Sequence, residues 1–264
     1  MNDKLVFLKL GGSLLTDKAG EEALRPEVLA GIAVELAQAR QDNPGLKLVL
    51  GHGSGSFGHV AGAKYGTRAG VTGEQQWYGF SIVSDAAARL NRAIISALLS
   101  AGVPAIGLPP SASAQVADGR IVDLAAAPIE AALDADLVPV VFGDVAFDSV
   151  RGGTIISTEE VMEFLAGKLQ PAWFLLAGET SGVYDLDGRT IPLITRETLA
   201  AVLPALGGSR GTDVTGGMAA KVIAMLDLVE KLPGLRVRIF SGLDSSALSR
   251  LLGDPDLPLG TLIQ

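Results

Sequence analysis

The two histidines of this chain, His52 and His59, lie in one nine-residue stretch rich in glycine and serine, residues 51–59. The apolar run before it, 46–50, is typical of a buried strand. Where a strand opens into glycine and serine, backbone N–H groups can converge on an anion, and glycine lets a phosphate approach closely. Because histidine also donates one or two hydrogen bonds near neutral pH, the stretch favours phosphate chemistry over a simple connector. A zinc site is disfavoured, since the sequence has no cysteine and no third histidine.

Lysines near the N-terminus could supply the positive charge that phosphate chemistry needs. Lys9 lies at the end of the first apolar run, 5–10, a Gly-Gly-Ser turn follows at 11–13, and Lys18 comes a few residues later. Burying an unpaired ammonium is costly, so a lysine that ends a buried strand indicates an anion close by. The alternative is a tight turn with a solvated lysine, which short glycine motifs often produce.

A second glycine-rich segment, residues 212–221, leads into an amphipathic stretch. Thr215 could cap a helix whose first turn holds Gly216 and Gly217, with Lys221 one turn further along its face. Glycine is a poor helix former, so two glycines in a first turn indicate the close approach of a ligand. A plain capped helix is the alternative.

Asp144 follows the apolar run 137–142 after one glycine. An acidic residue at the carboxyl end of a strand lies where open α/β sheets bind ligands, so Asp144 could orient two lysines or hold a metal. The alternative is a turn-forming aspartate. The sequence has no P-loop and no G-x-G-x-x-G motif that opens a first βα turn, so phosphoryl transfer would need another scaffold.

Short apolar runs alternate with amphipathic stretches, which predicts an α/β fold with a mostly parallel sheet covered by helices. We expect a single domain over residues 1–264, with one lobe at about 1–170 and a second at about 171–264. A polar, glycine-rich ribbon over 144–154 predicts a hairpin. Strands are predicted at 5–10, 46–50, 104–108, 137–142, 172–177, 236–240 and 260–263, and helices at 26–40, 75–101 (one long helix or a pair), 126–133, 158–169, 196–203, 217–231 and 245–252.

Composition narrows the class of protein further. The net charge of −8 argues against a nucleic-acid surface, which needs clustered lysine and arginine. No apolar run reaches the length of about 18 residues that spans a bilayer, and the N-terminus does not resemble a signal peptide. With no cysteine the chain fits a reducing compartment, so a cytoplasmic location is expected.

Taken together and in this order, these segments resemble the amino-acid kinase superfamily and, within it, the isopentenyl phosphate kinases. The resemblance runs from about residue 5 to 263, and its most specific feature is the Ser-Phe-Gly-His sequence that ends at His59. Other members of the superfamily lack a histidine there as a rule, apart from the related fosfomycin kinases. The matching segments are 9–13 with 16–18, 52–59, 79–81 with 90–91, 143–145 with 147–148, 213–218 with Lys221, and 260–261.

The resemblance implies a three-layer αβα sandwich and the ATP- and Mg²⁺-dependent phosphorylation of isopentenyl phosphate to isopentenyl diphosphate. Superfamily members commonly form dimers, so a homodimer is expected by analogy. An apolar pocket for the five-carbon chain is expected at 77–83, and His52 is expected to be structural. The implied ATP contacts are Lys9, Gly11, Gly12, Ser13, Gly55, Gly217 and Lys221; the implied substrate contacts are Ser54, His59 and Thr158; and the implied catalytic residues are Lys9, Lys18, His59, Lys221 and Asp144, with no protein ligand for a metal.

Three segments depart from the family pattern. Ser54 stands where glycine is usual, residues 157–160 read Ser-Thr-Glu-Glu where archaeal members have Ser-Gly-Asp-Asp, and 177–184 lack the usual Thr-Asp-Val-Asp-Gly. The alternatives to an isopentenyl phosphate kinase are a kinase of phosphonates such as fosfomycin and a non-catalytic nucleotide-binding relative. Three retained lysines favour a catalyst, because a protein that only binds nucleotide has little need for all of them.

Overall fold

The computed structural model describes residues 2–17, 19–206 and 217–264. Its centre is a continuous eight-stranded sheet in the order β10-β12-β11-β9-β1-β2-β6-β3. Neighbouring strands are parallel except for β11 and β12, which are antiparallel, so the carboxyl ends of β1, β2, β6, β9 and β11 meet at one edge. The bounds are β1 Asn2–Leu10, β2 Lys47–His52, β3 Ala105–Gly107, β6 Val138–Phe142, β9 Pro171–Gly178, β10 Leu193–Ile194, β11 Arg236–Ser241 and β12 Thr261–Ile263.

Alternation of side chains along the strands divides the core into two faces. On β1, Phe7 packs with one buried cluster while Val6 and Leu8 pack with the other. The first cluster contains α5 (Ala127–Asp134), α6 (Thr158–Leu169), α7 (Arg196–Leu206) and α8 (Gly217–Lys231); the second contains α2 (Pro26–Asp42), α4 (Glu74–Ser100) and α9 (Ala247–Gly253).

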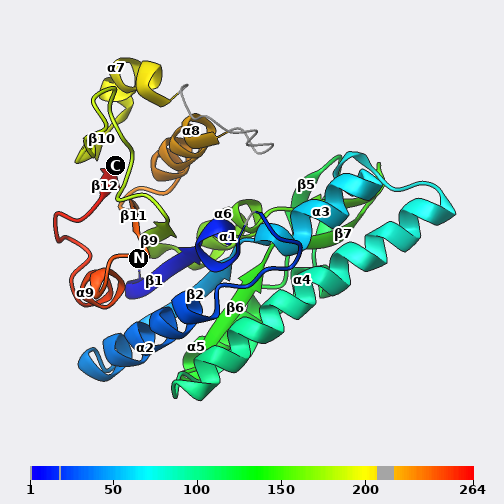
Figure 1. Ribbon diagram of the computed structural model, residues 1–264, viewed down its shortest axis with the longest axis horizontal. Coiled ribbons are helices and arrows are strands. Elements are labelled where there is room, and N and C mark those ends of the chain that lie inside the picture. Colours follow the sequence, from blue (N-terminus) through cyan, green and yellow to red (C-terminus); the bar gives the residue numbers. More distant parts are fainter. Residues whose placement is uncertain (1, 18, 207–216) are drawn as a thin grey trace.

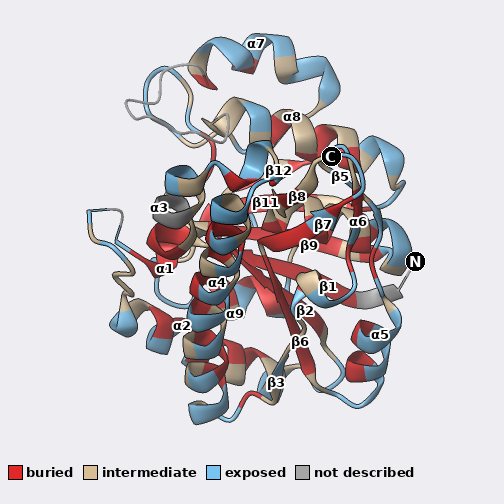
Figure 2. Cartoon of the chain, turned by 90° about the vertical axis from the view of Figure 1, so that its right-hand side faces the viewer, coloured by how far each residue is buried: buried red, intermediate tan, exposed pale blue. Residues whose placement is uncertain are grey.

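These two helical layers enclose the sheet, whose central strands are buried (Figures 1 and 2). The expected three-layer αβα sandwich is confirmed.

A second, four-stranded sheet in the order β5-β4-β7-β8 extends the fold beyond β6. Its strands are β4 Gln115–Ala117, β5 Arg120–Asp123, β7 Asp144–Asp148 and β8 Gly152–Ile156. Strands β7 and β8 form the predicted hairpin. The carboxylate of Asp148 accepts hydrogen bonds from the backbone N–H groups of residues 118, 119, 150 and 151, so it ties the hairpin turn to the β4–β5 turn.

The predicted long segments are confirmed within a few residues, and the stretch 75–101 is one helix, α4. The main error concerns the segment after β2, which the sequence suggested was a loop. Residues Gly55–Tyr65 form the helix α3, and a short helix, α1, spans Gly12–Leu15. Glycine favours a loop by propensity, but in α3 it permits close packing: a Cβ at Gly55 would overlap the hydroxyl of Thr16, and one at Gly62 would stand 3.1 Å from a methyl of Ile155. Within the described residues, no helix is both long and apolar enough to cross a bilayer.

Candidate active site

Lys9 and Glu159 form an ion pair at the carboxyl edge of the sheet. Lys9 is 7% exposed near the end of the central strand β1, and its Nζ lies 2.5 Å from Oε1 of Glu159 in the first turn of α6. A buried ammonium needs such a partner, because leaving it unpaired away from water is costly. The pair therefore holds the Lys9 ammonium where three neighbouring strands, β2, β1 and β9, end.

The charge of Lys221, on α8, also acts on Glu159. Burial by itself would raise the pKa of the Glu159 carboxyl, but the ammonium of Lys9 and, more weakly, that of Lys221 hold the pKa below its usual value. Two lysines far apart in the sequence are thus coupled to one carboxylate. The carboxylate that the structure places with them is Glu159, whereas the sequence suggested Asp144.

Asp144 lies at the start of β7 and is buried. Its carboxylate accepts hydrogen bonds from the backbone N–H of Val145 at 2.8 Å and from that of Ser111 at 3.3 Å. Burial raises the pKa of Asp144, and the hydrogen bonds from Ser111, Val145 and Ser84 oppose this rise. The structure thus shows Asp144 joining the second sheet to its surroundings. Among the described residues there is no cluster of three metal-ligating side chains.

The glycines of the first two strand ends pack against one another. A Cβ on Gly12 would overlap the backbone of Gly55, and a Cβ on Gly53 would stand 2.7 Å from the backbone nitrogen of Gly12. A Cβ on Gly55 would overlap the hydroxyl of Thr16, and Gly55 has a φ of +50°. These glycines let the N-termini of α1 and α3 lie together, an arrangement that directs backbone N–H groups toward an anion.

Thr158, the first residue of α6, uses its side chain to lock two strand ends. Its hydroxyl donates to the carbonyl of His52 at 2.7 Å and accepts from the backbone N–H of Gly143 at 2.8 Å. The helix cap before it is complete, because Ser157 and Glu160 exchange backbone and side-chain hydrogen bonds. The carboxyl ends of β2 and β6 are therefore fixed relative to the first turn of α6.

His52 is buried and stacked on Phe142, with its Nε2 3.3 Å from the amide oxygen of Asn91. Burial lowers the pKa of His52 to about 4, so its ring is neutral near pH 7. This environment supports the structural role expected for it.

An aromatic cluster lies on the second sheet beside α4. Trp77 and Phe80 of α4 contact each other with ring centroids 5.2 Å apart, and both contact Phe147 of β7. The cluster continues into the buried side chains of Val83 and Val145. Phe147 is 62% exposed, so this apolar cluster reaches the surface.

Comparison with known proteins places the chain in a family of kinases. Residues 4–241 match the model of the amino acid kinase family. Isopentenyl phosphate kinases from Haloferax volcanii and Methanocaldococcus jannaschii are 41% and 35% identical, over 85% and 86% of this chain and 88% and 87% of theirs. A solved isopentenyl phosphate kinase superposes with a TM-score of 0.82 at 30% identity, covering 98% of this chain and all of that one. The chain belongs to the isopentenyl phosphate kinase family of amino acid kinases.

Other residues of the kinase that the sequence singled out are placed as follows. Ser54 precedes α3 as its N-cap, and His59 is the fifth residue of that helix rather than the end of a loop. Gly11 precedes α1, and Ser13 lies within it. Gly217 begins α8 with a φ of +65°, and Lys221 lies one turn further on, half-buried. Lys18 and the segment 212–216, with its proposed cap Thr215, lie outside the described residues.

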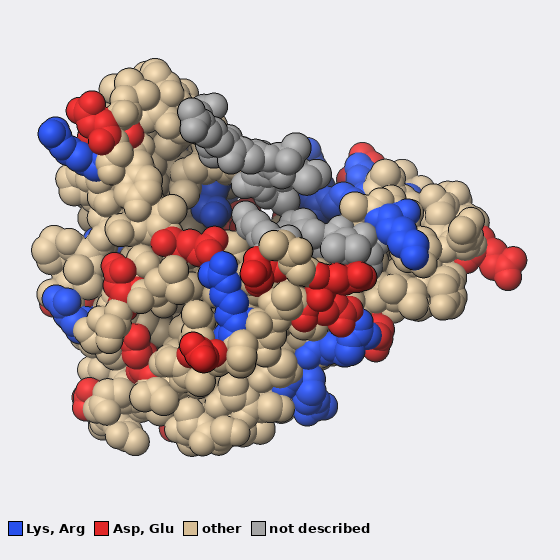
Figure 3. All heavy atoms as spheres, viewed as in Figure 1, with Lys and Arg blue, Asp and Glu red and all other residues tan. Residues whose placement is uncertain are grey.

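Sequence reasoning missed two groups in this kinase. Glu159 was noted only as a departure from an Asp-Asp pair, although a buried lysine at the end of β1 requires a carboxylate nearby. Arg68, which contacts the neighbouring Glu160, carried no sequence signal. On the face that Figure 3 shows, acidic and basic side chains are interspersed.

Proposed function

We propose that this kinase transfers the γ-phosphoryl group of ATP to the phosphate of isopentenyl phosphate, which yields isopentenyl diphosphate and ADP. The observation that carries the proposal is the pairing of Lys9 with Glu159 at the carboxyl edge of the sheet, with Lys221 acting on the same carboxylate. Donor and acceptor are both anions, and the ammonium groups of Lys9 and Lys221, which together outweigh the single carboxylate, would offset part of their repulsion.

The acceptor already carries a nucleophilic phosphate oxygen, so the protein needs no strong base and no covalent nucleophile. Its task is to bring two phosphates together in line and to neutralise the charge that develops between them. Lys9 and Lys221 would contact ATP, and Lys18 would stabilise charge in the transition state. Mg²⁺ would accompany the nucleotide, because it is bound mainly by phosphate oxygens and water.

The acceptor phosphate would lie at the N-terminus of α3, beside Ser54 and His59, with the backbone N–H of Thr158 nearby. The hydroxyl of Thr158 is engaged with His52 and Gly143, so only its backbone is offered to the substrate. The five-carbon chain would lie against the aromatic cluster of Trp77, Phe80 and Phe147, an apolar surface that suits an alkenyl group. The cytoplasmic location and the homodimer remain part of this proposal, as do Gly11, Gly12, Ser13, Gly55 and Gly217 as ATP contacts.

The decisive experiment is a panel of small monophosphates, phosphonates and amino acids assayed with Mg·ATP. We expect isopentenyl phosphate to give the highest kcat/KM and His59→Ala to lower that value by about 100-fold, as for loss of a charged hydrogen bond in the transition state. Turnover of fosfomycin without turnover of isopentenyl phosphate would assign the chain to phosphonate kinases instead. ATP binding without turnover of any acceptor would indicate a non-catalytic relative.

A further inference from the structure

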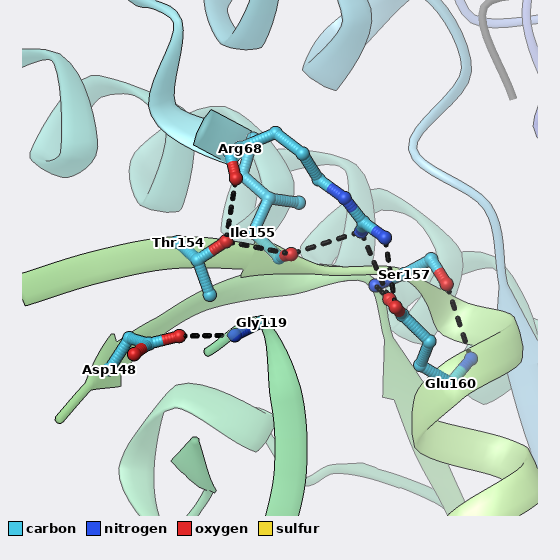
Figure 4. A network of polar contacts seen from close by, with 7 residues as sticks. All are labelled: Arg68, Gly119, Asp148, Thr154, Ile155, Ser157 and Glu160. Carbon is cyan, nitrogen blue, oxygen red and sulfur yellow. Dashed lines mark hydrogen bonds and ion pairs between the residues drawn. The ribbon is translucent and has the colours of Figure 1, made fainter. Parts of the chain in front are cut away.

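Arg68 fixes the end of α3, the helix that carries His59. Helix α3 ends at Tyr65, and a short 3₁₀ segment, Thr67–Ala69, follows it. The Arg68 guanidinium donates from Nη1 to the carbonyl of Ile155 and to Oε2 of Glu160, both at 3.0 Å, and from Nη2 to Oε1 of Glu160 at 2.8 Å (Figure 4). A bidentate arginine–carboxylate pair is both stronger and more directional than a single contact.

The backbone of this segment and of the residues just after it is held by β8 and by the residue before β8. The hydroxyl of Thr154 donates to the Arg68 carbonyl at 3.0 Å, and the Val71 N–H donates to the carbonyl of Arg151 at 2.9 Å. Near the end of α3, a Cβ on Gly62 would stand 3.1 Å from a methyl of Ile155, so this part of the helix lies against β8. Helix α3 itself packs mainly on α4, and its carboxyl-terminal end, with the 3₁₀ segment that follows, is held against β8 and α6 by these contacts.

Glu160 has a second task, because it completes the cap of α6 by accepting from the backbone N–H of Ser157 at 2.6 Å. Its neighbour Glu159 holds Lys9. Two consecutive carboxylates in one helical turn thus reach in different directions. One holds the lysine expected at the ATP phosphates, and the other holds the helix expected to carry the acceptor phosphate.

We propose that Arg68 and Glu160 act as a positioning pair that sets the distance of α3 from the first turn of α6, and so determines affinity for the phosphate acceptor rather than for ATP. This inference rests on the proposed function, in which His59 and Ser54 contact the acceptor. Displacement of a binding helix by even about 1 Å has large effects on phosphoryl transfer, because in-line geometry tolerates little error.

The test compares Arg68→Met, Glu160→Gln and the double variant with the wild-type protein. Glutamine keeps an oxygen for the helix cap but loses the charge, and methionine keeps length but loses all donors. Each single variant is expected to raise KM for isopentenyl phosphate by roughly five- to tenfold and to change KM for ATP less than twofold. The double variant should be no worse than the worse single one, because both lose the same contact. Arg68→Lys should recover only part of the affinity, since an ammonium cannot bind both oxygens in the same fork.

Arg40→Met serves as the matched control, because Arg40 likewise donates to a carbonyl and to a carboxylate, both of Asp136, but does not contact Glu160 or the segment after α3. Its KM values should equal those of the wild type.

Hydrogen exchange gives a readout independent of turnover: backbone amides of α3 should exchange faster in Arg68→Met, and those of α2 should not. Equal changes in both KM values, or unchanged KM for the acceptor with unchanged exchange in α3, would overturn the inference. Absence of turnover in the wild type would instead overturn the proposed function, while the exchange comparison would still decide whether the pair fixes α3.

Discussion

Helices α6 and α8 begin at the same edge of the sheet and pack on the same face, but their first turns differ in residue type. In α6, a serine cap leads into Thr158, Glu159 and Glu160, and each of these side chains makes a hydrogen bond or an ion pair. The described part of α8 begins with Gly217 at a positive φ. A first turn rich in side chains fixes its neighbours, whereas a glycine turn allows a ligand to approach backbone N–H groups. Helix α6 therefore fixes the strand ends around it, and α8 brings the charge of Lys221 to Glu159.

The largest expected effect concerns the two lysines that flank Glu159. Lys9→Met and Lys221→Met should each lower kcat by about 100- to 1,000-fold, since each removes charge stabilisation from the transition state. Lys9→Met should also lower the free energy of unfolding by about 2 kcal/mol, and more than Lys221→Met does, because Glu159 then loses its ion-pair partner. Steady-state kinetics with chemical denaturation separates the two effects. Equal losses of stability in both variants would remove the distinction drawn between α6 and α8.

Gly55, which packs between the ends of the first two strands, should matter more to the free energy of unfolding than Gly217, which begins α8. An alanine at Gly55 would overlap Thr16 and also adopt a positive φ, so Gly55→Ala should lower the free energy of unfolding by about 3 kcal/mol. Gly217→Ala should cost only about 1 kcal/mol of backbone strain. Urea denaturation measures both. If Gly217→Ala lowers the free energy of unfolding more than Gly55→Ala does, then the glycine at the start of α8 is needed for folding and not for the approach of a ligand.

Substitutions of Thr158 test whether its side chain, in the first turn of α6, holds the ends of β2 and β6 in place. Thr158→Val keeps the shape but leaves the His52 carbonyl and the Gly143 N–H without their partner, so the free energy of unfolding should fall by about 2 kcal/mol. Thr158→Ser keeps the hydroxyl and should recover most of this loss. If the valine and serine variants melt together in calorimetry, the hydroxyl does not fix β2 and β6.

The last comparison is between opposite pH dependences on the two sides of the sheet. Because His52 binds a proton below about pH 4 in the folded state and near 6.5 when unfolded, it makes the free energy of unfolding fall as pH drops from 6.5 to 4, by up to about 3 kcal/mol.

Glu163 of α6 behaves in the reverse way. Burial, followed by the charges of Glu159 and Glu160, raises its pKa from 4.5 to about 7, so stability falls as pH rises from 4.5 to 7. Solvent screens this half-buried group, so we expect only about 1 kcal/mol. Denaturation midpoints at pH 5 and pH 8 should show that His52→Gln removes the first slope and Glu163→Gln the second. The same slope in all three proteins would refute both assignments.

Much of this fold could be predicted from the sequence because its strands are apolar runs and its helices carry an apolar stripe. The predicted helix at 158–169 has the observed bounds, and its Ser-x-x-Glu cap is a local signal. Helix α3 was missed because Gly55, Gly58 and Gly62 argue against a helix locally, whereas their value lies in contacts with Thr16, Ser54 and Ile155, which are distant or invisible in the pattern.

The candidate site was likewise only partly predictable from the sequence. The order of lysine, histidine and glycine along the chain was enough to indicate a phosphate-transferring kinase of a known family. It could not determine which carboxylate meets Lys9, since Asp144 and Glu159 both follow strands or begin helices near the same edge. Only the parallel packing of β1, β2 and β6 against the first turn of α6 decided for Glu159. The physical reason is that an ion pair between residues 150 positions apart depends on how the elements stack in space, and local patterns of residues do not encode that distance.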